Sequence, residues 1–573
     1  WVASELTMPQ LGLTMTEGIV SQWLKQEGDV VRKGDCVVEV ETDKISNSIE
    51  SPVDGILLKI VAQEGEVLPV KGILGYIGLR GEVVDGAGTA GATAPTEKDT
   101  DILSVPVSEN GSKKKIIVIG AGPGGYVTAI KAAQLGANTV IIESENVGGT
   151  CLNIGCIPTK ALIHASSLYR SVLTEAKKVG VHISDISINW KETQKYKNSV
   201  VNRLVDGVDR LLKANGVKKY KGRGVVVDPH TVAVNGERIS ADYIILATGS
   251  EAVHLNFPGA DLPGVIDSTQ ALDLEDIPKS LVIIGGGVIG VEFASMFASV
   301  GTKCTIIEAL PHILPPVDKE IVSLVQADLE KRGIDVAVNA KVISIEKKCG
   351  SLLIHTERQG QEYCVQGDTV IVAVGRRPNT YHMGLEEVGV KLEGGKVVTD
   401  DTFRTSVPSI FAVGDCNGKL MLAHAASAQG VAAVEYIMTG KGVYEAATVP
   451  SCIYLEPEAA SVGLKEEDAI NKGIDYTVGK FALSGNGKSL IENGGVGMIK
   501  IIADTKYGEV LGVHMYGPRV TELIAACGLA IRLEATVDEL ITTVWAHPTV
   551  GESLGEAAAD VFGNAVHWPP KKK

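Results

Sequence analysis

The first 80 residues alternate apolar and polar positions over short runs, which is the periodicity of β-strands. The pattern occurs twice, at residues 18–31 (GIVSQWLKQEGDVV) and 55–68 (GILLKIVAQEGEVL), and both copies contain Gln-Glu-Gly before their last apolar run. Glycine and acidic residues separate the runs, as in tight turns. Two similar sets of strands in so short a segment predict a small sandwich of two sheets.

A further pair of alternating runs lies between the two copies, at residues 38–49. The runs flank Asp43-Lys44, which suits a tight hairpin with Lys44 at its exposed tip. Most lysines in such places are simply solvated. Residues 81–112 follow this domain without apolar periodicity and are rich in Gly, Ala, Thr and mixed charges. This composition predicts a flexible linker, which would raise the effective concentration of a tethered domain.

From residue 113 the pattern changes to apolar strands that run directly into glycine-rich turns. Residues 116–119 lead to Gly120, Gly122 and Gly125, then to a helical pattern and a second strand that ends in Glu143. This order predicts a Rossmann unit, in which the glycines permit a tight turn and a close approach of pyrophosphate. The acid is spaced to bind a ribose hydroxyl.

The same order recurs in residues 281–308. An apolar strand leads to Gly285, Gly287 and Gly290, and the strand after the next helix ends in Glu308. A carboxylate there accepts the 2′-hydroxyl of NAD and repels the 2′-phosphate of NADP, so NAD is expected. Two dinucleotide sites in one chain predict a relay of electrons from one cofactor to the other.

Composition excludes several classes of function. The chain has 573 residues, 45% of them hydrophobic, and a formal net charge of −15, which disfavours nucleic acid and anionic membrane as partners. Its nine cysteines are scattered, unlike a secreted disulfide framework. The first residues lack a signal peptide pattern and residues 281–300 read as a buried strand, turn and helix. We therefore predict a bacterial cytoplasmic protein without a membrane span.

Two cysteines form the exception to this scatter. Cys151 and Cys156 follow the first Rossmann acid, five positions apart, and can share one side of a helix start. They could be buried thiols or two metal ligands. No second Cys/His pair with zinc spacing lies nearby, so no metal site is expected. A helix N-terminus lowers the pKa of a thiol, which favours a redox role.

Two resemblances sharpen these expectations. The N-terminal repeat with Glu41-Thr42-Asp43-Lys44 is similar to the lipoyl and biotinyl carrier domains, and the lipoyl form implies a covalent lipoyl group on Lys44. From about residue 113 onward, the chain resembles the pyridine nucleotide–disulfide oxidoreductases, which include the dihydrolipoamide dehydrogenases. The resemblance rests on segments 151–160, 247–250, 373–379, 405–415 and 547–552.

This second resemblance assigns site residues. It implies FAD contacts from Gly120, Gly122, Gly125, Glu143, Thr150, Lys160, Gly249, Asp415 and Ala423. It implies NAD contacts from Gly285, Gly287, Gly290, Glu292, Glu308 and Gly375. Lys160 and Glu292 match the family's ion pair near the flavin.

The resemblance also implies a reaction. Cys151 exchanges with a dithiol substrate, Cys156 faces the flavin, and electrons pass through FAD to NAD⁺. His547, oriented by Glu552, acts as the acid/base from the other subunit of a homodimer. Trp545 departs from the family, where many members have another His, and this alters the approach to His547.

The implied protein is the reductase component of a 2-oxo-acid or acetoin dehydrogenase complex, with a lipoyl-bearing acyltransferase and other subunits as partners. Another NAD(P)H-dependent disulfide reductase remains an alternative, although Glu308 argues against NADPH. The absence of Cys-x-x-Cys in the N-terminal domain and of cysteine in the tail argues against a mercuric reductase. A tethered carrier or assembly module is the non-enzymatic alternative.

The predicted architecture is multidomain: a small all-β lipoyl-type sandwich, two Rossmann-like α/β nucleotide-binding domains and a C-terminal α+β dimerisation domain. The boundaries are 1–80 for the sandwich, 81–112 for the linker, 113–260 and 381–445 for the two parts of the FAD domain, 261–380 for the NAD domain and 446–573 for the interface domain.

Overall fold

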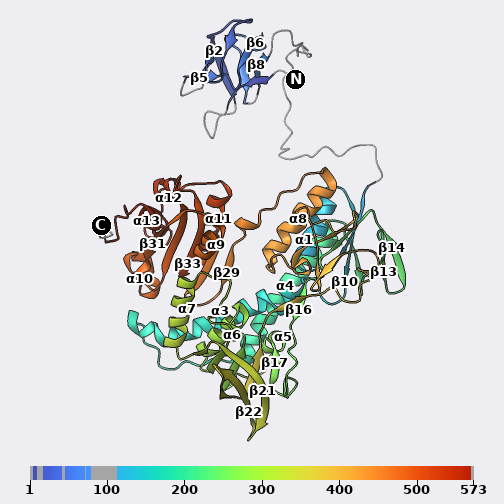
Figure 1. Cartoon of the computed structure of the whole chain (residues 1–573), viewed down its shortest axis with the longest axis vertical. Coiled ribbons are helices and arrows are strands. Elements are labelled where there is room, and N and C mark those ends of the chain that lie inside the picture. Colours follow the sequence, from blue (N-terminus) through green and yellow to red (C-terminus); the bar gives the residue numbers. More distant parts are fainter. Residues whose placement is uncertain (1–3, 10–16, 42–45, 71, 79–112, 570–573) are drawn as a thin grey trace. The chain divides into compact units, whose positions relative to one another are not determined.

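The computed structural model describes residues 4–9, 17–41, 46–70, 72–78 and 113–569 (Figure 1). The chain divides into two compact units, Trp1–Ser104 and Val105–Lys573. Lys44 and the predicted linker at 81–112 lie outside the described residues.

The N-terminal unit is a sandwich of two antiparallel four-stranded sheets, as the alternation predicts. The first sheet has the order β1-β8-β6-β3 and the second β5-β4-β2-β7. Their bounds are Ser4–Thr7 (β1), Glu17–Trp23 (β2), Val30–Val31 (β3), Cys36–Glu41 (β4), Ser46–Glu50 (β5), Gly55–Ile60 (β6), Val67–Pro69 (β7) and Ile73–Gly78 (β8). Leu57, Leu74 and Ile77 lie between the sheets without solvent exposure.

The two copies of the repeat exchange their short strands. β3 of the first copy pairs with β6 of the second, and β7 of the second pairs with β2 of the first. The turn carboxylates repeat this exchange: the backbone N–H of Ile60 donates to Glu27 Oε1 over 2.6 Å, and that of Trp23 donates to Glu64 Oε1 over 2.9 Å. The sequence duplication is therefore a structural duplication about a common core.

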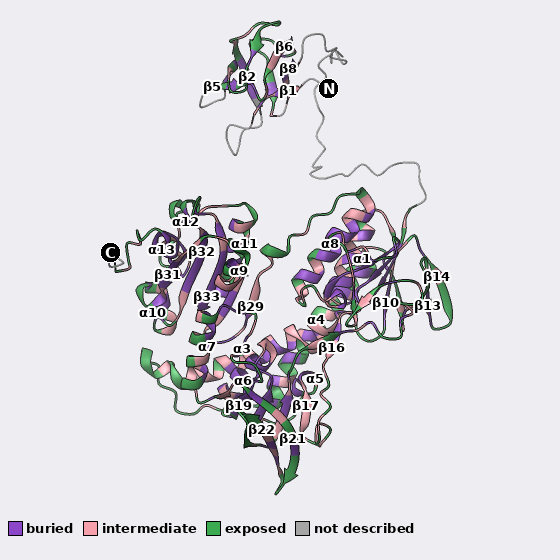
Figure 2. Cartoon of the chain, viewed as in Figure 1, coloured by how far each residue is buried: buried purple, intermediate pink, exposed green. Residues whose placement is uncertain are grey.

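The second unit begins with a parallel sheet in the order β11-β10-β9-β15-β28. Its strands are Lys115–Ile119 (β9), Asn138–Glu143 (β10), Lys218–Lys221 (β11), Tyr243–Leu246 (β15) and Ile410–Ala412 (β28). The helices with it are Pro123–Gln134 (α1), Gly149–Ile154 (α2), Cys156–Thr174 (α3), Trp190–Ala214 (α4) and Ala423–Thr439 (α8). Its continuous apolar strands are buried, as a parallel sheet requires (Figure 2). A meander of Val225–Asp228 (β12), Thr231–Val234 (β13) and Glu237–Ser240 (β14) adjoins it.

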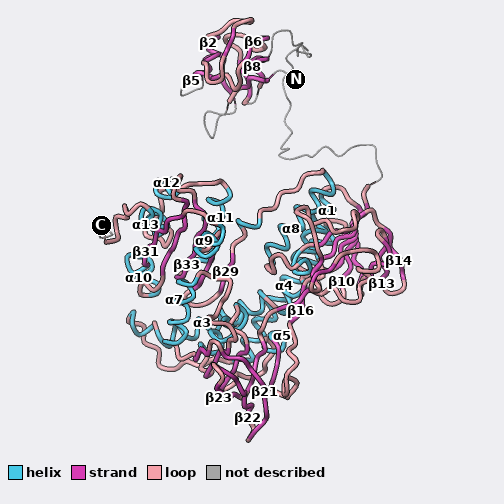
Figure 3. The backbone as a smooth tube through the Cα atoms, in the orientation of Figure 1, coloured by secondary structure: helices cyan, strands magenta, loops and turns pink. Residues whose placement is uncertain are grey.

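A second parallel sheet follows in the order β17-β24-β18-β19-β20. Its strands are Val265–Asp267 (β17), Ser280–Ile284 (β18), Lys303–Ile307 (β19), Asp335–Ala337 (β20) and Thr369–Val372 (β24). The helices are Ser268–Ala271 (α5), Val288–Ser299 (α6) and Lys319–Lys331 (α7). An antiparallel sheet of Ala340–Lys348 (β21), Ser351–Arg358 (β22) and Gln361–Gly367 (β23) extends from it (Figure 3). Ser250–Ala252 (β16) and Arg376–Pro378 (β25) pair where the two α/β parts join. A short hairpin of Leu392–Glu393 (β26) and Lys396–Val397 (β27) comes later in the chain.

The C-terminal part is an antiparallel sheet in the order β29-β30-β33-β32-β31, so the expected α+β class is confirmed. Its strands are Ser451–Ile453 (β29), Glu458–Gly463 (β30), Tyr476–Ala482 (β31), Met498–Asp504 (β32) and Val510–Gly517 (β33). The helices are Glu466–Lys472 (α9), Gly487–Asn493 (α10), Val520–Arg532 (α11), Val537–Thr542 (α12) and Glu552–Val561 (α13). Residues of α11, α12 and α13 share one apolar core with this sheet.

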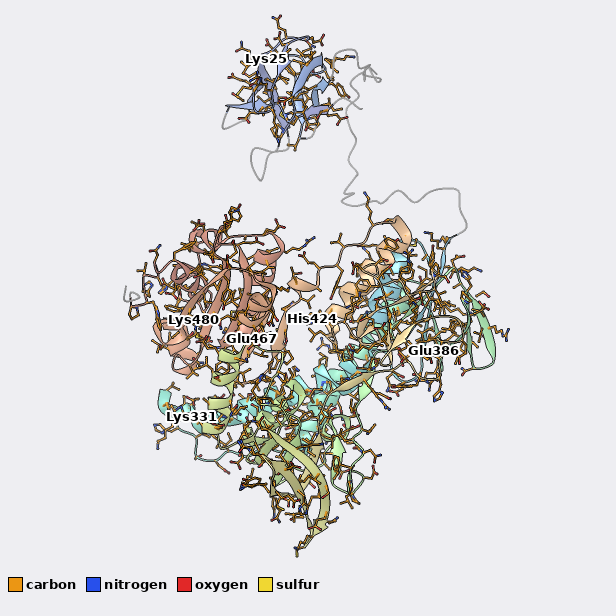
Figure 4. All side chains as sticks on the ribbon, in the orientation of Figure 1. Lys25, Lys331, Glu386, His424, Glu467 and Lys480 are labelled. Atoms are coloured by element: carbon orange, nitrogen blue, oxygen red, sulfur yellow. The ribbon has the colours of Figure 1, made fainter. Side chains whose placement is uncertain are left out.

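Ion pairs connect this C-terminal sheet to helix α7 of the second α/β part. Lys500 is buried and its Nζ lies 2.9 Å from Asp318 Oδ2 at the helix start. Lys480 contacts Glu320 over 2.7 Å, and Glu467 of the adjoining helix α9 pairs with Lys319. Figure 4 labels Lys480 and Glu467. The two parts also share a core, because Tyr516 of β33 packs in the cluster that contains α6 and α7. They are therefore one body within the unit.

Candidate active site

One large cavity of about 1960 Å³ lies where the carboxyl ends of the two parallel sheets approach each other. In α/β sheets this edge is the usual place of ligand binding. Strand β29 and helix α11 of the C-terminal part complete the wall. The sequence-predicted residues that line the cavity are Gly120, Gly122, Glu143, Thr150, Cys151, Cys156, Lys160, Gly249, Gly285, Gly287, Glu292, Glu308, Gly375, Asp415 and Ala423.

The glycines of the first loop are of two kinds: some are closely packed against backbone, and one has open space where a side chain would be. A Cβ on Gly120 would lie 2.2 Å from Ala247 O, and one on Gly125 would lie 1.8 Å from Gly120 O. These glycines are required by the packing of strand, turn and helix. Gly122 differs, because a Cβ there would meet nothing closer than 3.8 Å. Gly122 lines the cavity, so a ligand can approach its backbone closely.

The second loop repeats this division. A Cβ on Gly285 would lie 2.4 Å from Ala373 O, and one on Gly290 would lie 2.0 Å from Gly285 O. A Cβ on Gly287 would have no neighbour within 4 Å. Each loop therefore has one glycine that the protein's own packing does not explain. Each of these glycines also precedes a helix N-terminus, where backbone N–H groups attract a pyrophosphate.

The two predicted ribose acids hold equivalent positions. Glu143 accepts hydrogen bonds from the backbone N–H groups of Ala121 (2.6 Å) and Glu145 (2.7 Å). Glu308 accepts from Gly286 (2.6 Å) and Leu310 (2.8 Å). Each carboxylate is thus fixed beside its glycine loop at the cavity wall. The residues present therefore fit two dinucleotides in one cavity.

The cysteine pair lies between the two loops. Cys151 is in the short helix α2 and Cys156 begins the longer helix α3, so the two thiols belong to two helices rather than to one helix start. Gly155 makes the break, because a Cβ there would lie 2.8 Å from Thr150 O. A hydrogen bond from Cys151 lowers the pKa of Cys156 against the opposing effect of burial, and Lys160 lowers it further. The same hydrogen bond and burial raise the pKa of Cys151.

A partly buried ion pair lies beside the thiols. Lys160 Nζ lies 2.8 Å from Glu292 Oε2, and the Glu292 side chain is only 4% exposed. The backbone N–H of Tyr454 donates to Glu292 Oε1 over 2.9 Å, and the ammonium lies 4.7 Å from the centre of the Tyr454 ring. Burial raises the pKa of Tyr454 to about 12, so its phenol stays neutral beside the lysine.

A polar network closes another side of the cavity. Ser250 Oγ donates to Asp415 Oδ2 over 2.5 Å, and Arg376 Nε donates to Ser250 Oγ over 2.8 Å. A terminal nitrogen of Arg376 also reaches Thr150 Oγ1 at 3.4 Å. These contacts join strands β16 and β25 and the segment after β28 to the start of α2. They fix Asp415, for which the family resemblance implies an FAD contact, at the cavity surface.

His547 and Glu552 form a pair outside this cavity. His547 Nδ1 lies 2.8 Å from Glu552 Oε1, and the Thr549 N–H donates to Glu552 Oε2 over 3.0 Å. The histidine side chain is 80% exposed. Within one chain, the structure therefore pairs these two residues with each other and does not bring them to the cysteines.

Some cavity residues were not foreseen from the sequence as site residues. Tyr454 and Arg376 contact predicted residues, and His424 lines the cavity at the start of α8 (Figure 4). His424 Nε2 lies 2.7 Å from Pro450 O. Their contacts could not be predicted from the sequence, because each residue meets its partner across more than 20 positions of chain. The cation–π geometry of Tyr454 in particular depends on β29 reaching the cavity.

Comparison with known proteins identifies the family. Residues 114–430 match the model described as "Pyridine nucleotide-disulphide oxidoreductase", and residues 449–558 match its dimerisation domain. The chain belongs to the pyridine nucleotide–disulphide oxidoreductases. Residues 4–77 match the biotin/lipoyl model, described as "Biotin-requiring enzyme". The dimerisation domain supports a homodimer.

Individual members of this family are similar over most of the chain. Dihydrolipoyl dehydrogenase from Geobacillus stearothermophilus is 40% identical over 457 residues, covering 79% of this chain and 97% of the relative. Dihydrolipoamide dehydrogenase from Chaetomium thermophilum is 39% identical, covering 79% and 92%. Among solved structures, LpdA from Mycobacterium tuberculosis is similar with a TM-score of 0.72 and 27% identity, covering 78% and 99%. The HOCl-induced flavoprotein disulfide reductase RclA from Escherichia coli gives 0.70 and 29%, with the same coverage.

Among the described residues, no helix is both long and apolar enough to span a bilayer.

Proposed function

We propose that this chain oxidises dihydrolipoyl groups to lipoyl disulfides and delivers the electrons to NAD⁺. One observation carries the proposal: a cysteine pair with unequal thiol pKa values lies between two dinucleotide cradles in a single cavity. The 40% identity to a dihydrolipoyl dehydrogenase supports the choice of substrate. The carrier-type domain at 4–77 supports it independently.

The cysteines take part in thiol–disulfide exchange. A substrate thiolate attacks Sγ of Cys151 in the oxidised pair, the Cys151–Cys156 bond breaks, and Cys156 leaves as the thiolate. Its lowered pKa makes it the better leaving group. The second substrate thiol then attacks the mixed disulfide at the substrate sulfur, which releases lipoyl disulfide and Cys151 as a thiol. Lys160 stabilises the negative charge left on Cys156.

His547 is the base that takes the proton of the substrate thiol. Its exposed ring with an anchored carboxylate partner suits a residue that completes the site of a second subunit. Glu552 accepts from Nδ1, so Nε2 is the nitrogen free to accept a proton. This role requires a homodimer.

The chemistry that bound FAD and NAD supply is transfer of an electron pair from the reduced cysteines to nicotinamide. Glu143 and the first loop would hold FAD, and Glu308 and the second loop would hold NAD. This assigns residues 113–260 and 381–445 to an FAD domain, 261–380 to an NAD domain and 446–573 to an interface domain. Sandwich 1–80 carries a lipoyl group on Lys44, joined by linker 81–112.

The partners in this proposal are a lipoyl-bearing acyltransferase and other subunits of a 2-oxo-acid or acetoin dehydrogenase complex. The attached carrier-type domain supports such an assembly. A domain of this kind presents its thiols on an arm, and tethering raises the effective concentration of those thiols near a reductase site.

The test is NAD⁺ reduction by free dihydrolipoamide. The intact protein is compared with Cys156→Ser, with Lys44→Arg and with a version that starts at Lys113. We expect full activity after truncation and in Lys44→Arg, and loss of at least a thousandfold in Cys156→Ser, because exchange needs both sulfurs. Activity with NADPH and another disulfide, but none with dihydrolipoamide, would reject the substrate while leaving the thiol chemistry intact.

A further inference from the structure

The three-stranded sheet β21–β23 carries a second thiol site, separate from the cavity. Cys364 of β23 lies opposite His355 of β22 in the strand register, and its Sγ is 3.3 Å from His355 Nδ1. The other ring nitrogen, Nε2, is 3.4 Å from Glu346 Oε1 on β21. Each of the three strands therefore contributes one member of a Cys–His–Glu row. None of the three residues lines the large cavity.

The row lies on the outward face of this sheet, as the alternation of buried positions along β22 shows. Leu352 and Ile354 are buried on the inward face, and His355 falls between buried positions in the alternation of β22. Cys364 is exposed, and the side chains of His355 and Glu346 are 28% and 53% exposed. A reagent from solution can therefore reach the sulfur directly.

The order of the three groups suits a nucleophile with its base. A neutral imidazole has one N–H and one acceptor nitrogen, and the carboxylate of Glu346, 3.4 Å from Nε2, favours the proton on that nitrogen. The acceptor nitrogen is then Nδ1, which faces the thiol. His355 can accept the thiol proton, and Glu346 stabilises the imidazolium that results. Nucleophile, base and orienting acid are the three parts of an activated cysteine.

The neighbouring charges limit which reagents fit. The next cross-strand pair on the outward face is Glu357 of β22 and Glu362 of β23. Two carboxylates therefore adjoin the pair of His355 and Cys364. Glu346 adds a third carboxylate. Lys341 lies opposite Glu357, and Lys348 is two positions beyond Glu346 along β21, so three carboxylates face two lysines. Approach of an anionic reagent is disfavoured by this excess of negative charge. Neutral and cationic reagents are favoured.

We propose that Cys364 is a thiol-modification site for small, uncharged or cationic disulfides. His355 takes the proton from Cys364, and the thiolate attacks one sulfur of the disulfide. The reagent's S–S bond breaks, a Cys364–S–S–R bond forms, and the other half leaves as a thiolate that recovers the proton from His355. The disulfide reagent is the oxidant, and its leaving half is the reduced product. The site does not depend on the activity proposed for the cavity.

Cys349 provides a matched internal control. It is exposed like Cys364 and lies in the turn that joins β21 and β22 of the same sheet. The intact, oxidised protein is treated at pH 7 with cystamine, which is cationic, or with dithiodipropionate, which is anionic and of similar size. Samples are quenched by alkylation, and peptide mass spectrometry gives the rate of mixed-disulfide formation at each cysteine.

With cystamine, we expect Cys364 to react about tenfold faster than Cys349, because it has an adjacent base. His355→Gln should reduce the Cys364 rate to that of Cys349 and leave the Cys349 rate unchanged. Glu346→Gln should give an intermediate rate. All variants should keep the melting temperature and NADH formation of the parent, since the row lies outside the cavity.

Equal rates at Cys364 and Cys349, or a Cys364 rate that is insensitive to His355→Gln, would overturn the activated thiol. The preference for charge is tested separately. Dithiodipropionate should react more slowly than cystamine at Cys364, and Glu362→Gln should narrow the difference. Equal rates for the two reagents would reject the proposed class of ligand.

Discussion

The indole ring of Trp545 lies against the backbone of Gly555. A Cβ on Gly555 would be 3.2 Å from ring atoms Cδ1 and Nε1, and one on Gly551 would be 3.2 Å from Cε3. The indole Nε1–H donates to Leu540 O over 3.0 Å. Trp545 therefore joins α12 to α13 and fixes one end of the loop that carries His547.

Replacing this ring should impair catalysis through the position of His547. For Trp545→Ala we expect kcat to fall about tenfold, because small displacements of a catalytic base are costly, and the unfolding free energy to fall by about 3 kcal/mol. Gly555→Ala should reduce kcat similarly while keeping the indole. Trp568→Ala, which removes a ring packed on Phe481 in the same domain, is the control for stability alone. A normal kcat in both Trp545→Ala and Gly555→Ala would show that the ring only stabilises the domain.

The two kinds of glycine in the second loop should respond differently to alanine. Gly287→Ala places a methyl group in open space, so the melting temperature should stay within about 1 °C while the KM for NAD⁺ rises at least tenfold. Gly290→Ala places it 2.0 Å from Gly285 O and should destabilise the protein by about 2 kcal/mol. Thermal melting and NAD⁺ titration distinguish the two. An unchanged KM for NAD⁺ in Gly287→Ala would show that the second loop does not contact the nucleotide.

The choice between NAD⁺ and NADP⁺ should depend on Glu308. Glu308→Gln removes a negative charge that is fixed by two backbone N–H groups, so repulsion of a 2′-phosphate is relieved. We expect the ratio of kcat/KM for NADP⁺ to that for NAD⁺ to rise about tenfold. Glu143→Gln is the matched control at the first loop and should weaken flavin retention without changing this ratio. An unaltered ratio in Glu308→Gln would contradict the assignment.

The reactivity of Cys156 should depend on its neighbour Cys151. The pKa of Cys156 is lowered chiefly by a hydrogen bond from Cys151, against the effect of burial. The thiolate exists above that pKa, so removing the donor raises the pKa and moves thiolate formation to higher pH. In reduced protein, the pH profile of Cys156 alkylation should shift upward in Cys151→Ala and less in Cys151→Ser, which keeps a hydroxyl donor. Superimposable profiles in all three proteins would exclude this hydrogen bond as the cause.

Much of the site was predictable because its signals are local. Each glycine loop follows an apolar strand and precedes a helix, and each acid ends the next strand, so 28 residues contain the whole pattern in each copy. The physical reasons are local too: Gly125 meets Gly120, and Glu143 meets Ala121. The strand alternation likewise sufficed to predict the N-terminal sandwich.

What could not be predicted depends on contacts between distant segments. Tyr454 reaches Glu292 across 162 positions, and Arg376 reaches Ser250 across 126, so no spacing rule connects them. The Cys364 row is similar, because only the register of the three strands places Cys364 opposite His355 and makes Glu346 of β21 a diagonal neighbour of His355. Sequence periodicity indicates strands but not which residues of two strands face each other.

The exchange of β3 and β7 between the two halves of the N-terminal sandwich has a thermodynamic consequence. Each half obtains the edge strand of its sheet from the other, so neither half closes a core by itself. Although the two sequence copies follow one another along the chain, they must fold together, so the smallest cooperative folding unit contains both copies. Heat or denaturant should then melt this domain in one two-state transition, with no half-folded species at equilibrium.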